Sequence, residues 1–259
     1  MIIGNRVFEN YTYVMAIVNL TPDSFWSASR NTADSVLFTV EKAIKDGAAV
    51  IDLGPQSTRP GYTEVPPEEE IKRLEKPLEL IKKNFDIPVS VDTYFSRTAR
   101  AALQLGADMI NDVWGLSHDS DMADAVAERN AAVCIMHNAK NQLQGDIFPQ
   151  ILNFLKNNAE RAVAAGIDKN KICLDGGIGF AKDRAQNLEL LNGYDRLSVL
   201  SYPLLLGTSR KSLFGGKAED RLAPTLESTR FAARNKILFV RVHDVKENAE
   251  AIRETYGEN

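Results

Sequence analysis

The stretch PVSVDTYFSRTARAALQLGADMIND, residues 88–112, contains one complete unit of alternating strand and helix. Its apolar ends, 88–92 and 108–112, are short, as expected of parallel strands buried on both faces. Between them, 96–105 places apolar residues at helical spacing and stops before Gly106, as helices commonly do. The stretch therefore predicts two parallel strands joined by a crossover helix.

The same alternation runs through all 259 residues. Strands are predicted at 13–18, 49–53, 88–92, 108–112, 132–136, 171–175, 203–207 and 237–242, and helices at 32–46, 67–84, 96–105, 120–129, 149–165, 183–191, 223–235 and 245–256. This pattern predicts an α/β fold, a single (β/α)8 TIM barrel, whose usual length is about 250 residues. A doubly wound open sheet is the main alternative, but no G-x-G-x-x-G follows the first strand. Because no internal repeat or Pro/Ser-rich linker interrupts the chain, we expect one domain over 1–259.

The composition indicates an ordinary globular protein. A formal net charge of -4 gives no electrostatic footprint for nucleic acid. No apolar run reaches the roughly 18 residues needed to cross a bilayer, and the N-terminus lacks the pattern of a signal peptide. Cys134 and Cys173 lie in apolar runs, so we expect buried free thiols. We therefore predict a cytoplasmic protein without nucleic-acid or membrane partners.

Polar side chains gather where the predicted strands end. Because the carboxyl ends of all strands in a TIM barrel open onto one face, these residues should converge on one pocket. They are Asn19 after the first strand, Thr58 and Arg59 after the second, Asp92 at the third, Asn111 at the fourth, Met136 and His137 at the fifth, Asp175 at the sixth, Ser209, Arg210 and Lys211 after the seventh, and Arg241, His243 and Asp244 at the eighth.

The residue types at these strand ends match a flat, charged ligand. Asp92, Asn111 and Asp175 offer the acceptors and amide donors that a planar heterocycle with a guanidine-like edge requires. Cationic or donor groups suited to a phosphorylated or carboxylated ligand are Lys211, Arg241, Arg59 and His243.

Two further features indicate an anion and its counter-ion. The loop GTSRKS (207–212) is short and leads towards a predicted helix N-terminus, an arrangement suited to binding an anion. Asn19 is placed to supply an oxygen to Mg²⁺, which usually keeps several waters and is shared with substrate phosphates.

Several of these residues also have a purely structural interpretation. Asp92 precedes a helix and could cap it, and Arg59 could be a solvated loop charge. His118 lies in a polar loop and is expected to be exposed, whereas His137 is either a satisfied structural histidine or part of the site. The chain has no H-E-x-x-H, C-x-x-C or G-x-S-x-G, so zinc and activated-serine chemistry are weakly supported.

Seven segments resemble the dihydropteroate synthase family, in the family's order and from end to end of the chain. They are VNLTPDSF (18–25), STRPG (57–61), VSVDT (89–93), INDVWG (110–115), LDGGIGF (174–180), GTSRKS (207–212) and RVHDVKE (241–247). The resemblance implies a TIM-barrel transferase that condenses 6-hydroxymethyl-7,8-dihydropterin diphosphate with p-aminobenzoate. The products would be pyrophosphate and 7,8-dihydropteroate, for folate biosynthesis. Mg²⁺ as cofactor, a homodimer and sensitivity to sulfonamides, which mimic p-aminobenzoate, are also implied.

Carried over position by position, the resemblance implies a role for each matching residue. The pterin would be held by Asp92, Asn111, Met136, Asp175, Phe180 and Lys211. The diphosphate would be bound by Asn19, Arg241 and His243, with Asn19 also at the Mg²⁺. The p-aminobenzoate site would comprise Thr58, Arg59, Pro60 and Ser209. Asp92, Lys211, Arg241 and His243 would act catalytically, by stabilising the charges that separate as the C–O bond breaks.

The chain departs from the usual family pattern mainly in two loops. Gly54-Pro55-Gln56 precedes STRPG where the family usually has Gly-Gly-Glu, and Trp26-Ser27-Ala28-Ser29 stands where Ser-Asp-Gly-Gly is common. Pro55 removes an N–H and fixes φ, and Gln56 removes a charge. These changes put arylamine affinity and turnover in question, so a non-catalytic pterin-binding paralogue is one alternative. A pterin-dependent methyltransferase is another, although it would not need STRPG or GTSRKS.

Overall fold

The computed structural model describes residues 1–20, 31–56 and 64–257. Eight parallel strands close into a barrel in which each strand pairs with the next along the chain and β10 pairs with β3. The strands are β3 (Tyr13–Asn19), β4 (Ala48–Gly54), β5 (Val89–Asp92), β6 (Met109–Asp112), β7 (Ala132–Met136), β8 (Ile172–Asp175), β9 (Leu204–Leu206) and β10 (Phe239–Val242). The closure confirms the predicted TIM barrel and excludes the open sheet.

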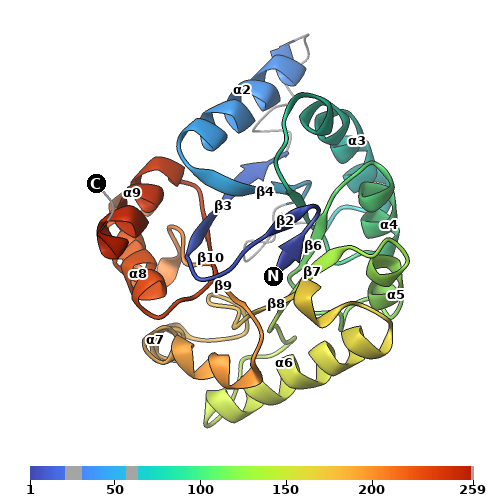
Figure 1. Cartoon of the computed structure of the whole chain (residues 1–259). Helices are drawn as coiled ribbons and strands as arrows, with labels where there is room; N and C mark the ends of the chain where they lie inside the picture. Colours follow the sequence, from blue (N-terminus) through green and yellow to red (C-terminus); the bar gives the residue numbers. More distant parts are fainter. Residues whose placement is uncertain (21–30, 57–63, 258–259) are drawn as a thin grey trace.

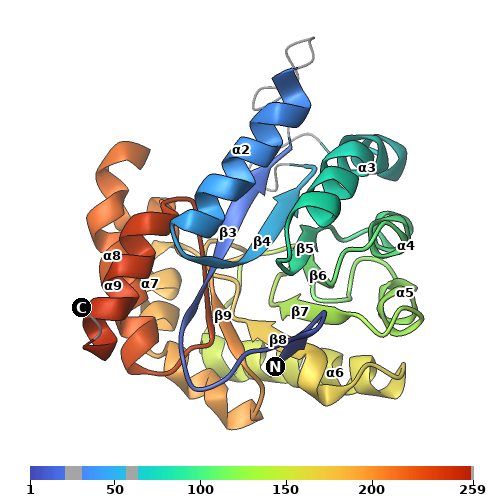
Figure 2. The same cartoon turned by 45° about the horizontal axis from the view of Figure 1, so that its top comes forward.

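Helices form a ring around the barrel (Figures 1 and 2). They are α2 (Asn31–Lys45), α3 (Pro67–Asn84), α4 (Ser96–Gln104), α5 (Met122–Ala127), α6 (Ile147–Ala164), α7 (Arg184–Asn192), α8 (Leu222–Arg234) and α9 (Val245–Tyr256), with short 3-10 helices η1 (Lys169–Lys171), η2 (Tyr194–Leu200), η3 (Ser212–Phe214) and η4 (Ala218–Arg221). All eight predicted helices are confirmed, with ends that differ by at most two residues. None of the helices in the described ranges is long and apolar enough to cross a membrane.

A small N-terminal hairpin, which the sequence did not predict, covers the amino end of the barrel. Strands β1 (Ile2–Ile3) and β2 (Arg6–Val7) pair antiparallel and lie across the barrel's centre in Figure 1. Ile3 and Phe8 are buried in the same apolar cluster as the inward-facing Met15 and Phe239. Two-residue strands are too short to produce a readable alternation, which is why the pattern missed them. With the amino end filled by apolar side chains, a polar site is left to the carboxyl end.

The interior of the barrel changes character along each strand. Residues two apart point to the same side of a strand, so inward-facing positions recur at every second residue. Near the amino end of the barrel, the inward-facing residues are apolar and form one cluster. The residues between them face outward and form a second apolar cluster with the helices. Cys134 and Cys173 lie in the inner cluster as buried free thiols with their Sγ atoms 3.9 Å apart, as predicted. At the next inward-facing position, two residues closer to the carboxyl end, five strands carry polar side chains. These are Asp52, Asp92, Asn111, Asp175 and Arg241.

Candidate active site

The polar side chains at the carboxyl ends of the strands surround a cavity of about 450 Å³. This volume is in the range that small-molecule sites occupy. Of the thirteen residues to which the resemblance assigns a role, ten line it: Asn19, Asp92, Asn111, Met136, Asp175, Phe180, Ser209, Lys211, Arg241 and His243. The other three, Thr58, Arg59 and Pro60, lie outside the described residues, as does Trp26. Arg210 lines the cavity as well, whereas His137 and Asp244, also predicted at strand ends, are not in the lining.

Arg241 is held between two buried carboxylates. Its Nε donates to Asp52 Oδ2 at 2.6 Å, and its Nη2 donates to Asp92 Oδ2 at 2.7 Å. Burial opposes the charge of the guanidinium, but Asp52 and Asp92 outweigh this effect and raise the pKa of Arg241. The arrangement fixes a permanent cation at the floor of the cavity.

The sequence pattern did not single out Asp52, because it lies inside the predicted strand 49–53 and not after it. Besides Arg241, it accepts a hydrogen bond from Asn111 Nδ2 at 3.3 Å, and it has no exposed surface. An inward-facing Asp inside the apolar run AVIDL was the only available signal. Buried carboxylates are rarely left without partners, so such a residue points to an interior cation.

One carboxylate oxygen of Asp92 is available to accept a hydrogen bond from a ligand. Asp92 Oδ1 is buried and has no hydrogen-bond partner among the described residues, although the side chain lines the cavity. Burial raises the pKa of Asp92, and Arg241 opposes that rise. The alternative that Asp92 caps the next helix is wrong, because the N-cap of α4 is Phe95 and the carboxylate faces inward to Arg241.

Asp175 and Lys211 form the opposite wall. Asp175 Oδ1 accepts hydrogen bonds from Gly177 N at 2.7 Å and from the Tyr194 hydroxyl at 2.9 Å. Lys211 Nζ donates to the carbonyl of Ile178 and lies 4.8 Å from the centre of the Phe180 ring. Burial lowers the pKa of Lys211 to about 8, and the charge of Asp175 limits the fall. The wall thus combines an oriented carboxylate, a cation and an aromatic face.

Ser209 contacts both the backbone and the ring of His243. The Ser209 hydroxyl accepts a hydrogen bond from the His243 backbone N–H at 3.1 Å and lies 2.9 Å from His243 Nδ1. A hydroxyl oxygen has two lone pairs as well as a proton, so this contact holds the imidazole ring in place with either tautomer. With a proton on Nε2, the ring is a donor suited to a phosphate oxygen.

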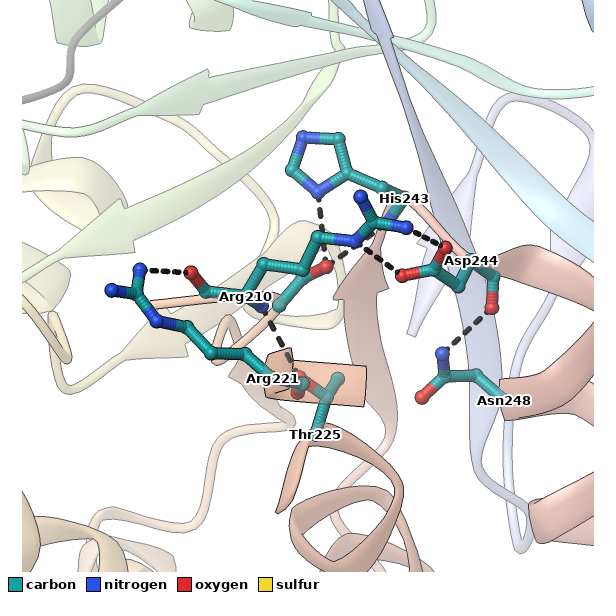
Figure 3. Close-up of polar contacts among 7 residues, drawn as sticks. Arg210, Arg221, Thr225, His243, Asp244 and Asn248 are labelled. Atoms are coloured by element: carbon teal, nitrogen blue, oxygen red, sulfur yellow. Dashed lines mark hydrogen bonds and ion pairs between the residues drawn. The ribbon is translucent and has the colours of Figure 1, made fainter. Parts of the chain in front are cut away.

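The loop after β9 is held by arginines rather than by a helix N-terminus. Arg210, with φ of 51°, forms an ion pair with Asp244, and Arg221 donates to the carbonyl of Arg210 (Figure 3). Arg221 also donates to the carbonyls of Gly215 and Gly216. The three-residue η3 begins at Ser212, the last residue of GTSRKS, and the helix predicted over 223–235 follows as α8, which begins at Leu222.

The half-buried Lys182 ties the loop after β8 to the end of the neighbouring strand β7. Lys182 Nζ lies 3.0 Å from His137 Nδ1 and donates to the carbonyls of Gly177 and Phe180, both at 3.0 Å. Burial lowers the pKa of Lys182 to about 7 and that of His137 to about 3. His137 is therefore a neutral structural histidine outside the cavity lining, which resolves its two interpretations. His118 is exposed, as predicted.

Gly177 allows this loop to pass close to β7. Its φ is 71°, and a Cβ at this position would lie 1.9 Å from the carbonyl oxygen of His137. We predict that Gly177→Ala lowers the free energy of unfolding by more than about 2 kcal/mol, since it adds a steric clash to an unfavourable φ. Urea denaturation would measure this loss.

Gly257→Ala is the matched control for this prediction. Gly257, which follows α9, has nearly the same φ, 76°, in the left-handed region, but nothing lies within 4 Å of a Cβ placed there. We expect it to lose only about 1 kcal/mol, the cost of the backbone conformation alone. Equal losses in the two variants would show that the close approach to His137 does not constrain the loop.

The residues present fit a Mg²⁺ ion held largely by ligand oxygens and water. Among the residues that the structure describes, no three His, Cys, Asp or Glu side chains come together as a metal site. Asn19 lines the cavity at the end of β3, next to Gly54, where a Cβ would lie 3.4 Å from Asn19 Oδ1. One neutral oxygen suits an ion that takes most of its ligands from phosphate and solvent.

Comparison with known proteins places the chain among pterin-binding enzymes. The sequence model of a family described as pterin binding enzyme matches residues 15–243. A dihydropteroate synthase from Clostridium beijerinckii is 44% identical over 263 aligned residues, which cover 98% of each chain. The solved dihydropteroate synthase from Clostridium difficile, in the presence of pteroic acid, superposes with a TM-score of 0.93 at 42% identity, covering 96% of this chain and 97% of that one. The solved dihydropteroate synthase from Xanthomonas albilineans with 4-aminobenzoic acid superposes with a TM-score of 0.90 at 35% identity. The match covers 96% of this chain and 93% of that one.

Proposed function

Because the chain belongs to the dihydropteroate synthase family of pterin-binding enzymes, we propose that the cavity at the carboxyl ends of its strands is where a pterin and p-aminobenzoate are joined. The activity is that of a transferase in folate biosynthesis. It condenses 6-hydroxymethyl-7,8-dihydropterin diphosphate with p-aminobenzoate to give 7,8-dihydropteroate and pyrophosphate. The residues of this chain that bind the pterin, the diphosphate and the arylamine are assigned in turn below.

The pterin ring is assigned to the polar floor and the wall opposite. Asp92 and Asp175 accept from the ring's amino and N–H groups, Asn111 adds an amide, and Lys211 donates to a ring acceptor, with Met136 and Phe180 packing against the ring faces. The observation that carries this assignment is the unpartnered, buried Asp92 Oδ1 in the cavity lining. A buried acceptor without a partner is costly, and a ligand N–H relieves that cost.

The diphosphate is assigned to the side of the cavity that carries Arg241, His243 and Asn19. Arg241 and His243 Nε2 donate to the departing oxygens, and Mg²⁺, when bound through Asn19 and water, supplies further positive charge to the leaving group. As the C–O bond breaks, positive charge on the pterin methylene is stabilised by Asp92 and Asp175. Charges fixed in advance in this way are usually the largest catalytic contribution.

The arylamine is assigned to Thr58, Arg59 and Pro60 together with the loop of Ser209. The solved relative with 4-aminobenzoic acid supports an arylamine site in a barrel of this kind. The amine attacks the methylene with its lone pair and loses its proton afterwards, so no strong base is needed. We expect sulfonamides to compete for this site. We further propose that the chain acts in the cytoplasm as a single-domain homodimer.

Pyrophosphate release is the direct test of these assignments. With purified protein, we expect release to require the pterin diphosphate, p-aminobenzoate and Mg²⁺ together, to stop on chelation with EDTA, and to return on adding Mg²⁺. Isothermal titration of the pterin diphosphate would be run in parallel. Binding of the pterin diphosphate without release of pyrophosphate would favour the non-catalytic paralogue. Pyrophosphate release that does not depend on p-aminobenzoate would contradict the assigned reaction.

A further inference from the structure

The hydroxyl of Tyr194 joins three parts of the chain at the point where Asp175 enters the cavity. Tyr194 begins η2, and its side chain has no exposed surface. Its Oη accepts a hydrogen bond from the backbone N–H of Gly176 at 2.7 Å and lies 2.9 Å from Asp175 Oδ1 and 2.5 Å from the carbonyl oxygen of Leu205. Asp175 and Leu205 are paired residues of β8 and β9. One buried hydroxyl therefore fixes the end of β8 to the neighbouring strand.

The direction of these hydrogen bonds follows from the donors available. A phenol carries one proton and two lone pairs, and a backbone N–H can only donate, so Gly176 occupies one lone pair. The single hydroxyl proton lies between two acceptors, Asp175 Oδ1 and the carbonyl of Leu205, and both share it in a three-centre hydrogen bond. Burial raises the pKa of Tyr194, so the phenol keeps its proton at neutral pH. Tyr194 is therefore a fixed donor to the carboxylate.

The two oxygens of Asp175 have different surroundings. Oδ1 accepts a hydrogen bond from Gly177 N at 2.7 Å as well as from Tyr194, so the donors of the protein gather on this oxygen. Oδ2 lies on the side of Gly207, which lines the cavity, and a Cβ at Gly207 would be 3.7 Å from it. Because Oδ1 is held from behind, Oδ2 is the oxygen that is turned towards a ligand.

Gly176 makes room for the ring that carries this hydroxyl. A Cβ at Gly176 would lie 2.9 Å from Cε2 of Tyr194 and 3.0 Å from Cδ1 of Leu197. The backbone of Gly176 is outside the left-handed region, so the neighbouring side chains, and not the backbone conformation, exclude a larger residue. The Tyr194 ring and Gly176 therefore form one packed unit behind Asp175.

We propose that Tyr194 is a positioning residue that orients Asp175 and stabilises its negative charge, so that Oδ2 accepts a hydrogen bond from the pterin ring. The inference rests on the proposed binding of the pterin at Asp175. A carboxylate held by fixed donors loses little side-chain freedom when a ligand binds, and a charged acceptor makes the stronger hydrogen bond. Tyr194 does not line the cavity, so its effect on the ligand passes through Asp175.

The experiment is a double-mutant cycle on the Kd for the pterin diphosphate, measured by isothermal titration of the purified protein without p-aminobenzoate. We expect Tyr194→Phe to raise the Kd about tenfold, the effect of one lost buried hydrogen bond, and Asp175→Asn to raise it at least as much. In the Asp175→Asn protein, Tyr194→Phe should add less than about twofold, because the carboxylate through which it acts is no longer there. Gly176→Ala displaces the ring without removing the hydroxyl, and it should raise the Kd as well.

The pH dependence of the Kd distinguishes an effect on the carboxylate from a general structural effect. Burial raises the pKa of Asp175, and the neighbouring cations and hydrogen-bond donors, Tyr194 among them, oppose that rise. The other charged or titratable groups that face Asp175 are Lys211, Lys182, Arg241 and the Cys134 thiol. These groups remain in Tyr194→Phe, so losing the hydroxyl moves the pKa of Asp175 further up. The ratio of the Kd of the variant to that of the natural chain, in which the titration of the ligand cancels, should therefore be larger at pH 6 than at pH 8.

Tyr256→Phe is the matched control, because it removes a hydroxyl whose contacts lie away from the cavity. The Tyr256 hydroxyl contacts Thr12 Oγ1 and donates to the carbonyl of Ala233, and none of these residues lines the cavity. The control should change the Kd for the pterin diphosphate less than about twofold, since sites that share no partners act independently.

The outcomes separate the role of Tyr194 from the pterin site itself. An unchanged Kd in Asp175→Asn overturns the pterin assignment and the positioning role with it. A raised Kd in Asp175→Asn with an unchanged Kd in Tyr194→Phe overturns the positioning role alone. Additive losses in the double variant, the same Kd ratio at both pH values, or an equal loss in Tyr256→Phe also overturn it, because the hydroxyl would then not act through the charge of Asp175. If Tyr194→Phe does not fold, an unchanged Kd in a folded Gly176→Ala protein overturns the proposal.

Discussion

Lys211→Ala is expected to lower kcat/KM for the pterin diphosphate by about 10²- to 10³-fold, the loss usual when a preorganised charge is removed from an active site. Lys211 Nζ lies over the Phe180 ring and donates to the carbonyl of Ile178, so the methyl group of alanine would leave a gap beside the buried Asp175. The carboxylate of Asp175 would lose the positive charge that most strongly opposes the rise in its pKa, and the ring of the pterin would lose a donor. Steady-state pyrophosphate release measures the effect.

Lys217→Ala is the control for this variant, because Lys217 lies in the same loop but is exposed and forms a surface ion pair with Glu219 at 3.8 Å. We expect it to turn over normally, since exposed ion pairs contribute little. A Lys211→Ala protein with less than a threefold loss would remove Lys211 from the catalytic assignment. So would an equal loss in both variants.

The pH dependence of turnover gives a second readout of Lys211. Burial lowers the pKa of Lys211 to about 8, so the natural enzyme should lose rate as the pH rises through that value, and Lys211→Ala should lack this fall. The free energy of unfolding should change with pH in the opposite direction to the rate. The unfolded chain holds the Lys211 proton up to a pKa of about 10.4, so between these two values the unfolded state binds more protons and this residue's contribution to stability rises with pH. A fall in rate through pH 8 therefore reflects the charge of Lys211 and not unfolding.

The sequence predicted the parts of the fold that periodic burial controls. Continuous apolar runs such as 132–136 became strands buried on both faces, and the acidic turn after Pro66 begins α3, where Pro67 occupies the first turn and negative charge is favourable. It also placed most of the polar residues at the carboxyl ends of the strands in one cavity, because barrel closure brings every strand end to the same face; His137 and Asp244 are the exceptions among those that the structure describes. The loop after β9 was harder, since its shape depends on the side chain of Arg221 reaching back to carbonyls five to eleven residues away.

What the sequence could not show is which polar residues neutralise one another. Asp52 and Lys182 lie inside predicted regular or loop segments with no motif around them, and their importance comes only from partners distant in the chain. Arg241 contacts Asp52 across 189 positions and Asp92 across 149. A pattern within one strand carries no information about such a pair, because register and closure must first bring the strands together. The same reasoning explains why Tyr194, which lies between a predicted helix and a predicted strand, was not identified until its contact with Asp175 was seen.

Arg241→Met is the second large change that we expect, and its signature is in stability as well as in rate. Methionine preserves much of the side-chain volume but leaves Asp52 and Asp92 buried and facing each other without a cation. Removing one partner of a buried ion pair typically costs about 3–5 kcal/mol, because the remaining charge is uncompensated. We expect a loss of this size in the free energy of unfolding at pH 8, measured with urea, and no detectable pyrophosphate release.

Arg230→Met on α8 is the control. Its pairs with Glu227 and Glu254 involve largely exposed carboxylates, so it should lose less than about 1 kcal/mol.

The pH dependence of the Arg241→Met deficit distinguishes a lost ion pair from lost packing. Burial already raises the pKa of Asp92, and Arg241 opposes that rise, so removing Arg241 moves the pKa of Asp92 further above the value of about 4 that it has in the unfolded chain. Between those two values the folded variant binds more protons than the unfolded one, and its stability therefore falls as the pH rises. The deficit relative to the natural chain should be smaller at pH 5, where a proton can take the place of the missing cation, than at pH 8. A deficit of the same size at both values would mean that Arg241 contributes through the packing of its side chain, and that the two carboxylates are neutralised by some other means.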